Sequence, residues 1–205
     1  VIQGSTGRHH AQIVAGAPFD VFLAADARRP ADLERRGLVV PGSRFCYAVG
    51  ELVLWWPDPP RPVPGDLRTA LLAPDLQHLA LANPWLAPYG EAAVQTLESL
   101  DLPSGVPYER VQGQNIVQAW QFVASGNAEA GLVARSLLAA ADAEAEGLVL
   151  TVPPTRHDPI EQHAVLLRDA RQPEAAAALL DFLRGEAAGA IIASFGYRVP
   201  PADRP

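Results

Sequence analysis

Lysine and methionine are absent from the 205-residue sequence, and Cys46 is its single cysteine. Without lysine the chain has no Schiff-base nucleophile, no attachment point for pyridoxal phosphate and no lysine for a phosphate-binding loop. A single cysteine excludes an internal disulfide and a cysteine-only metal cluster, and inside an apolar strand we expect it to be a buried, inert thiol. Because an initiator methionine is missing, we expect the chain to be processed or trimmed.

Long apolar runs and positive charge are also scarce. No stretch of about 18 apolar residues is available to span a membrane. The 16 arginines are outnumbered by 23 acidic residues, which gives a net charge of −7, and no basic run occurs. Since binding the phosphate backbone of a nucleic acid requires a clustered positive field, we expect no nucleic-acid partner. The apolar content of 49% is that of an ordinary globular protein.

Apolar runs alternate with helical patterns along the chain, which predicts an α/β fold. Two long runs, 45–56 and 160–167, are interpreted as strands that cross between two lobes. We expect each lobe to be a mostly parallel sheet flanked by helices, with the ligand cleft between them. Lobe I would comprise residues 1–48 plus 163–205, and lobe II residues 49–162. Further strands are expected at 1–3, 19–23, 78–82, 108–111, 130–134 and 148–152, and helices at 9–15, 27–36, 67–72, 88–100, 136–141, 173–184, 186–194 and after Asn115.

Three of the predicted strand-to-helix turns are rich in small and polar residues. They are residues 4–7 (Gly-Ser-Thr-Gly), 88–90 (Pro-Tyr-Gly) and 114–116 (Gln-Asn-Ile). Each offers backbone N–H groups at a helix N-terminus, where the macrodipole favours an anion, and the first two add hydroxyls. None carries lysine or arginine. Fixed neutral donors suit a fully ionised oxyanion that has no proton to donate, so we expect discrimination by size and protonation state.

Several motifs, in this order, resemble the periplasmic molybdate-binding proteins of ABC transporters: residues 4–7, 11–13, 16–26, 41–45, 87–90, 113–116, 124–131 and 195–197. The resemblance extends over essentially the whole sequence. It implies a two-lobed type II periplasmic binding protein fold that closes on molybdate or tungstate, without enzymatic activity and without a cofactor. It also implies a periplasmic or lipid-anchored extracytoplasmic location, a monomer, and an ABC transporter permease as partner.

The resemblance also implies the ligand residues. Thr6, with Ser5 beside it, matches the hydroxyl ligand of the family, Tyr89 matches a residue that gives its amide and hydroxyl, and Ile116 matches a backbone N–H ligand. The molybdenum or tungsten atom would be bound only as part of the oxyanion, through these same residues. No residue would coordinate it directly as a cation. Ala134 stands where some members have a tyrosine, and we expect Tyr89 to replace that bond. The family's first strand and helix, with a further hydroxyl ligand in the turn between them, have no counterpart in this sequence, so that ligand and one strand of the first sheet are expected to be absent.

Each feature has a simpler interpretation as well. Taken alone, residues 4–7 are typical of a helix-capping loop, Tyr89 of an aromatic that lines a pocket, Ile116 of core packing and Asn115 of an N-cap. Three functional alternatives stay open: a cytoplasmic oxyanion-sensing effector domain, a binding protein for another oxyanion such as sulfate, and an enzyme with Ser5 and His9 as a nucleophile pair.

The histidines show no metal-ligand spacing. His9 and His10 would point about 100° apart on a helix, so they cannot chelate one metal ion, and we interpret them as surface residues. His157 and His163 flank Asp158 and Glu161, but this spacing matches no zinc motif.

Overall fold

The computed structural model describes residues 1–142 and 147–200. The chain divides into two compact units. Unit 1 consists of Val1–Gly50 and the segment that begins at Ile160, and unit 2 is Glu51–Pro159. The predicted lobe boundaries, 48/49 and 162/163, lie within three residues of these divisions. The end of the predicted lobe I, residues 201–205, falls outside the described residues.

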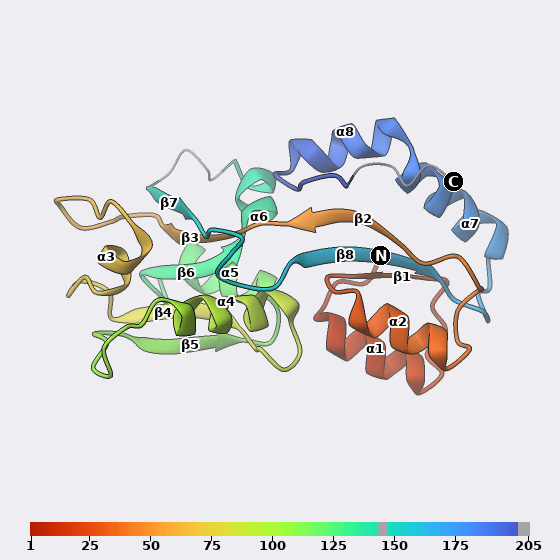
Figure 1. The fold of residues 1–205 in the computed structure, drawn as a ribbon, viewed down its shortest axis with the longest axis horizontal. Coiled ribbons are helices and arrows are strands. Elements are labelled where there is room, and N and C mark those ends of the chain that lie inside the picture. Colours follow the sequence, from red (N-terminus) through yellow and green to blue (C-terminus); the bar gives the residue numbers. More distant parts are fainter. Residues whose placement is uncertain (143–146, 201–205) are drawn as a thin grey trace. The chain divides into compact units, whose positions relative to one another are not determined.

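The described part of unit 1 contains the strands β1 (Val21–Ala24), β2 (Phe45–Gly50) and β8 (Ile160–Leu166), and the helices α1 (Thr6–Val14), α2 (Arg28–Arg35), α7 (Pro173–Arg184) and α8 (Glu186–Ser194). The sheet order is β1-β8-β2. Helices α1 and α2 cover one face, while α7 covers the other, with α8 packed against α7 (Figure 1). Ile13, Phe22 and Leu33 belong to the core on the first face. Leu166 and Leu180 belong to the core on the second.

The strand directions in unit 1 contradict the prediction of a mostly parallel sheet. β8 pairs antiparallel with both β1 and β2. The reason is topological, because β2 carries the chain out of unit 1 and β8 carries it back. A strand-helix-strand rhythm gives parallel neighbours only when the second strand is placed beside the first. Here the returning strand β8 is inserted between β1 and β2.

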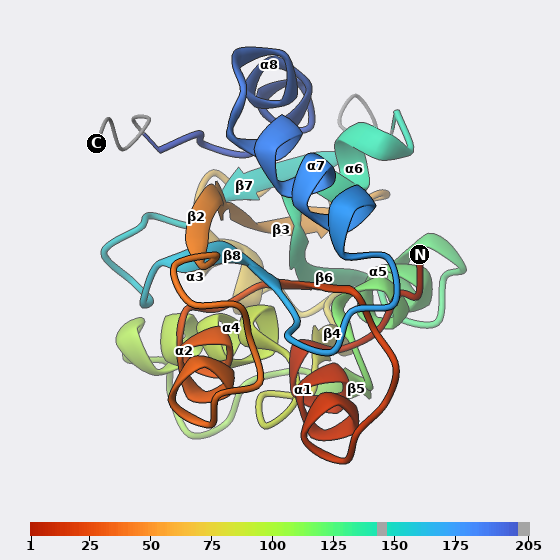
Figure 2. The same ribbon diagram turned by 90° about the vertical axis from the view of Figure 1, so that its right-hand side faces the viewer.

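The described part of unit 2 contains the strands β3 (Leu52–Trp56), β4 (His78–Ala82), β5 (Glu109–Gly113), β6 (Ala130–Ala134) and β7 (Leu148–Thr151), and the helices α3 (Leu67–Leu71), α4 (Pro88–Ser99), α5 (Ile116–Ala124) and α6 (Arg135–Ala140). The sheet order is β5-β4-β6-β3-β7. β4 pairs parallel with β5 and β6, as predicted, but β3 pairs antiparallel with β6 and β7. Helices α4 and α5 lie on opposite faces of this sheet (Figure 2).

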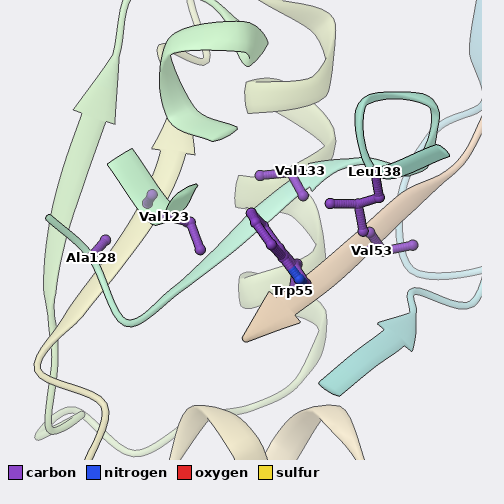
Figure 3. Close-up of a cluster of buried hydrophobic side chains, with 7 residues drawn as sticks. Val53, Trp55, Val123, Ala128, Val133 and Leu138 are labelled. Atoms are coloured by element: carbon purple, nitrogen blue, oxygen red, sulfur yellow. The ribbon is translucent and has the colours of Figure 1, made fainter. Parts of the chain in front are cut away.

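The core of unit 2 includes a cluster on the α5 side of the sheet. Trp55 lies at its centre, among side chains from β3, β6, α5 and α6 (Figure 3). The indole rings of Trp55 and Trp120 stack at 6.4 Å with an interplanar angle of 12°. All five residues of β3 are buried, which agrees with the uninterrupted apolar run in the sequence because both faces of the strand are covered.

Two strand predictions are wrong. The run 45–56 is not one strand, because it divides at Glu51 into β2 and β3, which pair in different sheets. Residues 1–3 form no strand, since no described strand pairs with them. Each predicted helix is present, and α1 begins at Thr6, three residues before the predicted start at His9. None of the helices in the described part of the chain combines the length and hydropathy needed to cross a membrane.

Candidate functional site

The first predicted turn forms the N-terminus of α1. Ser5 is the N-cap, with extended backbone dihedrals of φ −73° and ψ 142°, and Thr6 is the first helical residue. The two residues are only 5% and 7% exposed. The predicted turn therefore supplies the N-cap and the first residues of α1. The N–H groups of these first residues have no carbonyl partner within the helix.

The Thr6 hydroxyl is oriented by the segment that follows β1. The backbone N–H of Ala25 donates to Thr6 Oγ1 over 3.1 Å. A hydroxyl oxygen that accepts a backbone N–H still carries its own proton and can donate that proton to an anion. The Ala25 bond therefore leaves the Thr6 hydroxyl with the hydrogen-bond polarity that an oxyanion ligand requires.

The other hydrogen-bond donors of the α1 turn, the Ser5 hydroxyl and the backbone N–H groups, take no part in a side-chain cap. Ser5 makes no side-chain bond to its own helix, and the first turn of α1 contains no acidic residue. Among the residues that the structure describes, the N–H groups of Thr6, Gly7 and Arg8 form no hydrogen bond. The positive end of the helix dipole is therefore not neutralised by a carboxylate of the first turn.

The third predicted turn is the N-terminus of α5, and its cap is confirmed. Asn115 Oδ1 accepts the N–H of Gln118 at 2.9 Å. Gln118 Oε1 accepts the N–H of Gln114 at 2.6 Å, so the reciprocal pair is a capping box displaced by one residue. This arrangement satisfies the third N–H of the helix, and the N–H groups of Ile116 and Val117 point out of the helix end.

The side chain of Ile116 packs against the buried cluster of Ala82, Ala87 and Ala119. The core-packing interpretation of Ile116 is therefore confirmed. It does not conflict with the ligand interpretation, because the backbone N–H at the first helical position is separate from the side chain. A Cβ on Gly113 would lie 2.7 Å from the Ala119 nitrogen, so only glycine allows α5 to start this close to the end of β5.

The second predicted turn begins α4. Tyr89 is the second helical residue and is 4% exposed. Pro88 before it has no N–H, and the N–H groups of Gly90 and Glu91 both donate to the Ala87 carbonyl, at 2.8 and 3.1 Å. A Cβ on Gly90 would lie 2.7 Å from the carbonyl carbon of Ala82. The start of α4 is thus pressed against the end of β4.

The two turns of unit 2 lie at one edge of the sheet. β4 and β5 are parallel neighbours with Ala82 paired to Gly113, and the N–H of Asn83 donates to the Gly113 carbonyl over 2.7 Å. The structure therefore brings the turns of Tyr89 and Ile116 together within unit 2, and Ser5 and Thr6 together within unit 1. Ala134 ends β6 as the N-cap of α6 and has no side-chain donor.

The interpretation of His9 and His10 as plain surface residues is wrong. The His9 ring packs against the Phe19 ring, with centroids 6.0 Å apart. Burial, and then the charge of Arg8, lower the pKa of His9 below its ordinary value. His10 Nε2 lies 2.9 Å from Asp32 Oδ2. In the stretches 1–142 and 147–200, no three His, Cys, Asp or Glu side chains form a group that could hold a metal ion.

An α/β chain in two units, with helix N-termini that carry open neutral donors, has the architecture of a solute-binding protein. The model of the family described as bacterial extracellular solute-binding protein matches residues 1–198, and the chain belongs to this family. The predicted periplasmic binding protein fold, extracytoplasmic location and lack of enzymatic activity are thereby confirmed.

The chain is also similar to individual proteins. The sequence is 44% identical over 194 residues to the molybdate-binding protein ModA of Rhodobacter capsulatus, which covers 95% of this chain and 75% of that protein. It is 45% identical to ModA of Azotobacter vinelandii, with 95% and 76% covered. The structure of the periplasmic molybdate-binding protein of Azotobacter vinelandii matches with a TM-score of 0.87 and 36% identity, over 97% of this chain and 86% of that chain.

Proposed function

We propose that the chain captures molybdate or tungstate outside the cytoplasm and delivers it to the permease of an ABC importer. The ligands of the oxyanion are the hydroxyls of Ser5 and Thr6, the N–H and hydroxyl of Tyr89, and the N–H of Ile116. The observation that carries the proposal is the hydrogen bond from the N–H of Ala25 to Thr6 Oγ1. Because Oγ1 accepts this bond, the buried Thr6 hydroxyl has its proton available to donate to an anion. The sequence identity of 44% to a molybdate-binding protein supports molybdate as that anion.

The chemistry of the turns supports an oxyanion rather than a cation or a neutral solute. The first turns of α1 and α5 contain no acidic side chain, and their donors are backbone N–H groups and hydroxyls. Each hydrogen bond to a charged ligand contributes about 1.5 to 3 kcal/mol. Phosphate near pH 7 retains a proton that needs an acceptor, and the proposed ligands offer that proton no carboxylate, only hydroxyl oxygens, which are weaker acceptors.

The specificity is tested by thermal unfolding of the protein with molybdate, tungstate, sulfate or phosphate at equal concentration. We expect molybdate and tungstate to raise the midpoint strongly, sulfate less, and phosphate not at all. Ligand at about 100 times its Kd stabilises the native state by about 2.7 kcal/mol. Equal shifts with all four anions would contradict selection by size and protonation state.

The role of Thr6 is tested by Thr6→Ala, with Thr6→Ser as the matched control. We expect the alanine variant to bind molybdate more weakly by about 1.5 to 3 kcal/mol, the range for a lost hydrogen bond to a charged group. The serine variant keeps the hydroxyl and should retain most of the affinity. An unchanged Kd for Thr6→Ala removes Thr6 from the site.

A further inference from the structure

We propose that His9 is a positioning residue for the α1 turn, and that its ring holds the backbone at Gly4 so that Ser5 presents its hydroxyl to the oxyanion. The inference rests on the proposed function of this turn. A Cβ on Gly4 would overlap His9 Nε2 and would lie 3.2 Å from Cδ2 and 3.4 Å from Cε1. The imidazole ring therefore lies directly on the backbone at Gly4.

The two residues occupy the positions of a helix staple. Gly4 precedes the N-cap Ser5, and His9 is the fourth residue of α1. In a hydrophobic staple, side chains at these two positions pack together and fix the angle at which the chain enters the helix. Here the preceding residue has no side chain, so the ring of His9 covers its backbone instead.

Few other contacts hold this segment. Val1 and Ile2 are exposed, and within the described residues the backbone of residues 1–4 forms no hydrogen bond. The ring of His9 is itself supported by Phe19, which packs against the core cluster of unit 1. A continuous series of contacts therefore runs from the core through Phe19 and His9 to Gly4.

Ser5 depends on this support more than Thr6 does. The Thr6 hydroxyl is held by Ala25, whereas Ser5 makes no capping bond, so the direction of its hydroxyl follows the backbone of the turn. The lowered pKa of His9, caused by burial and then by Arg8, favours the neutral ring. The ring thus acts through packing and not through a charge on the oxyanion.

The experiment is a double-mutant cycle read out as the molybdate Kd from calorimetry. The variants are His9→Ala, Gly4→Ala, the double variant, and His9→Phe, which keeps a ring at position 9. The three atoms nearest to a methyl group on Gly4 all belong to the His9 ring, so the substitution displaces a side chain and not the backbone. We expect each alanine substitution to weaken binding about 5- to 10-fold, because a misplaced donor loses its bond geometry.

The pattern across the cycle distinguishes positioning from general stability. Both substitutions break one contact, so the double variant should bind no more weakly than His9→Ala alone, and His9→Phe should bind within about twofold of wild type. Additive losses, or an unchanged Kd for His9→Ala while Thr6→Ala still weakens binding, overturn the inference and leave the proposed site intact. If neither His9→Ala nor Thr6→Ala changes the molybdate Kd, the proposed site itself is wrong, and the inference about His9 is wrong with it. Thermal midpoints of the unliganded variants test whether each variant is folded.

Discussion

The N-termini of α1 and α5 expose backbone donors by opposite means. Both helices have nine residues and no acid in the first turn. At α5 the cap is local, since Asn115 and Gln118 satisfy the turn within a few residues. At α1 there is no side-chain cap. Its turn is held by the N–H of Ala25, 19 residues away, and by the His9 ring of the same helix, which packs on Phe19. A locally capped turn keeps its geometry by itself, whereas an uncapped turn frees more donors but depends on the rest of unit 1.

The largest effect is expected from Gly113→Ala, which attacks the placement of the α5 turn. The added Cβ would lie 2.7 Å from the Ala119 nitrogen and 3.1 Å from the Asn115 oxygen. Both are backbone atoms, so the helix start itself must move. We expect the free energy of unfolding to fall by about 1 to 3 kcal/mol or more, measured by urea denaturation.

The matched control for Gly113→Ala is Gly105→Ala in the same unit, where a Cβ would meet nothing within 4 Å. This substitution should change stability by less than about 0.5 kcal/mol. Equal effects of the two substitutions would show that the close approach of α5 to β5 is not what Gly113 provides.

The contrast between a capped turn and an uncapped one also explains what the sequence could predict. The Asn115 cap was predicted correctly because the residues that form it are three positions apart. The partner of Thr6 was missed because Ala25 lies 19 residues away, and no local pattern marks that contact. The second open N–H of α5, at Val117, could have been inferred from the predicted cap, since the cap satisfies only the third position.

The fold shows the same limit. Helix and strand periodicity placed β4, β6 and α7 at their observed bounds, because periodicity is a local property. The insertion of β8 between β1 and β2 is set by the path of the chain through the two units, so the prediction of a mostly parallel sheet was wrong for unit 1. Glu51, where the apolar run divides into β2 and β3, is the one charged residue in 45–56 and is the available local signal for that break.

The second prediction tests the backbone donor of the α5 turn directly. Ile116→Pro removes the N–H at the first helical position, where proline is tolerated. Asn115 has φ −150° and ψ 174°, which suits a residue that precedes proline. We expect molybdate affinity to fall by about 1.5 to 3 kcal/mol, measured by calorimetry.

Ile116→Val is the control for this change, because it trims the side chain in the core and keeps the N–H. It should bind molybdate nearly as well as wild type. A proline variant with wild-type affinity would mean that the Ile116 N–H is not a ligand, whatever the effect of the valine variant on stability.

The third prediction compares the two caps. Asn115→Ala removes a bond to the helix backbone and should lower the free energy of unfolding by about 1 kcal/mol. Ser5→Ala removes a side chain that caps nothing, so it should change stability by less than about 0.5 kcal/mol while weakening molybdate binding. Chemical denaturation without ligand measures the change in stability of both variants. A Ser5 variant as destabilised as the Asn115 variant would show that Ser5 is a structural cap.

The smallest effect is expected from the titration of His9. Its pKa is lowered in the folded state, first by burial and then by Arg8, from an ordinary value of 6.5. Below that value the unfolded chain binds the proton more readily than the folded one, so stability falls as the pH decreases through 6.5 toward the folded-state pKa. His9→Phe keeps the ring on Gly4 and removes this titration, so its unfolding free energy should decline less between about pH 7.5 and 5. The other titrating groups are common to both proteins and cancel in the difference. Parallel stability curves would show that the His9 ring in the α1 turn is as solvated as in the unfolded chain, and the support of that turn would then have to come from Ala25 alone.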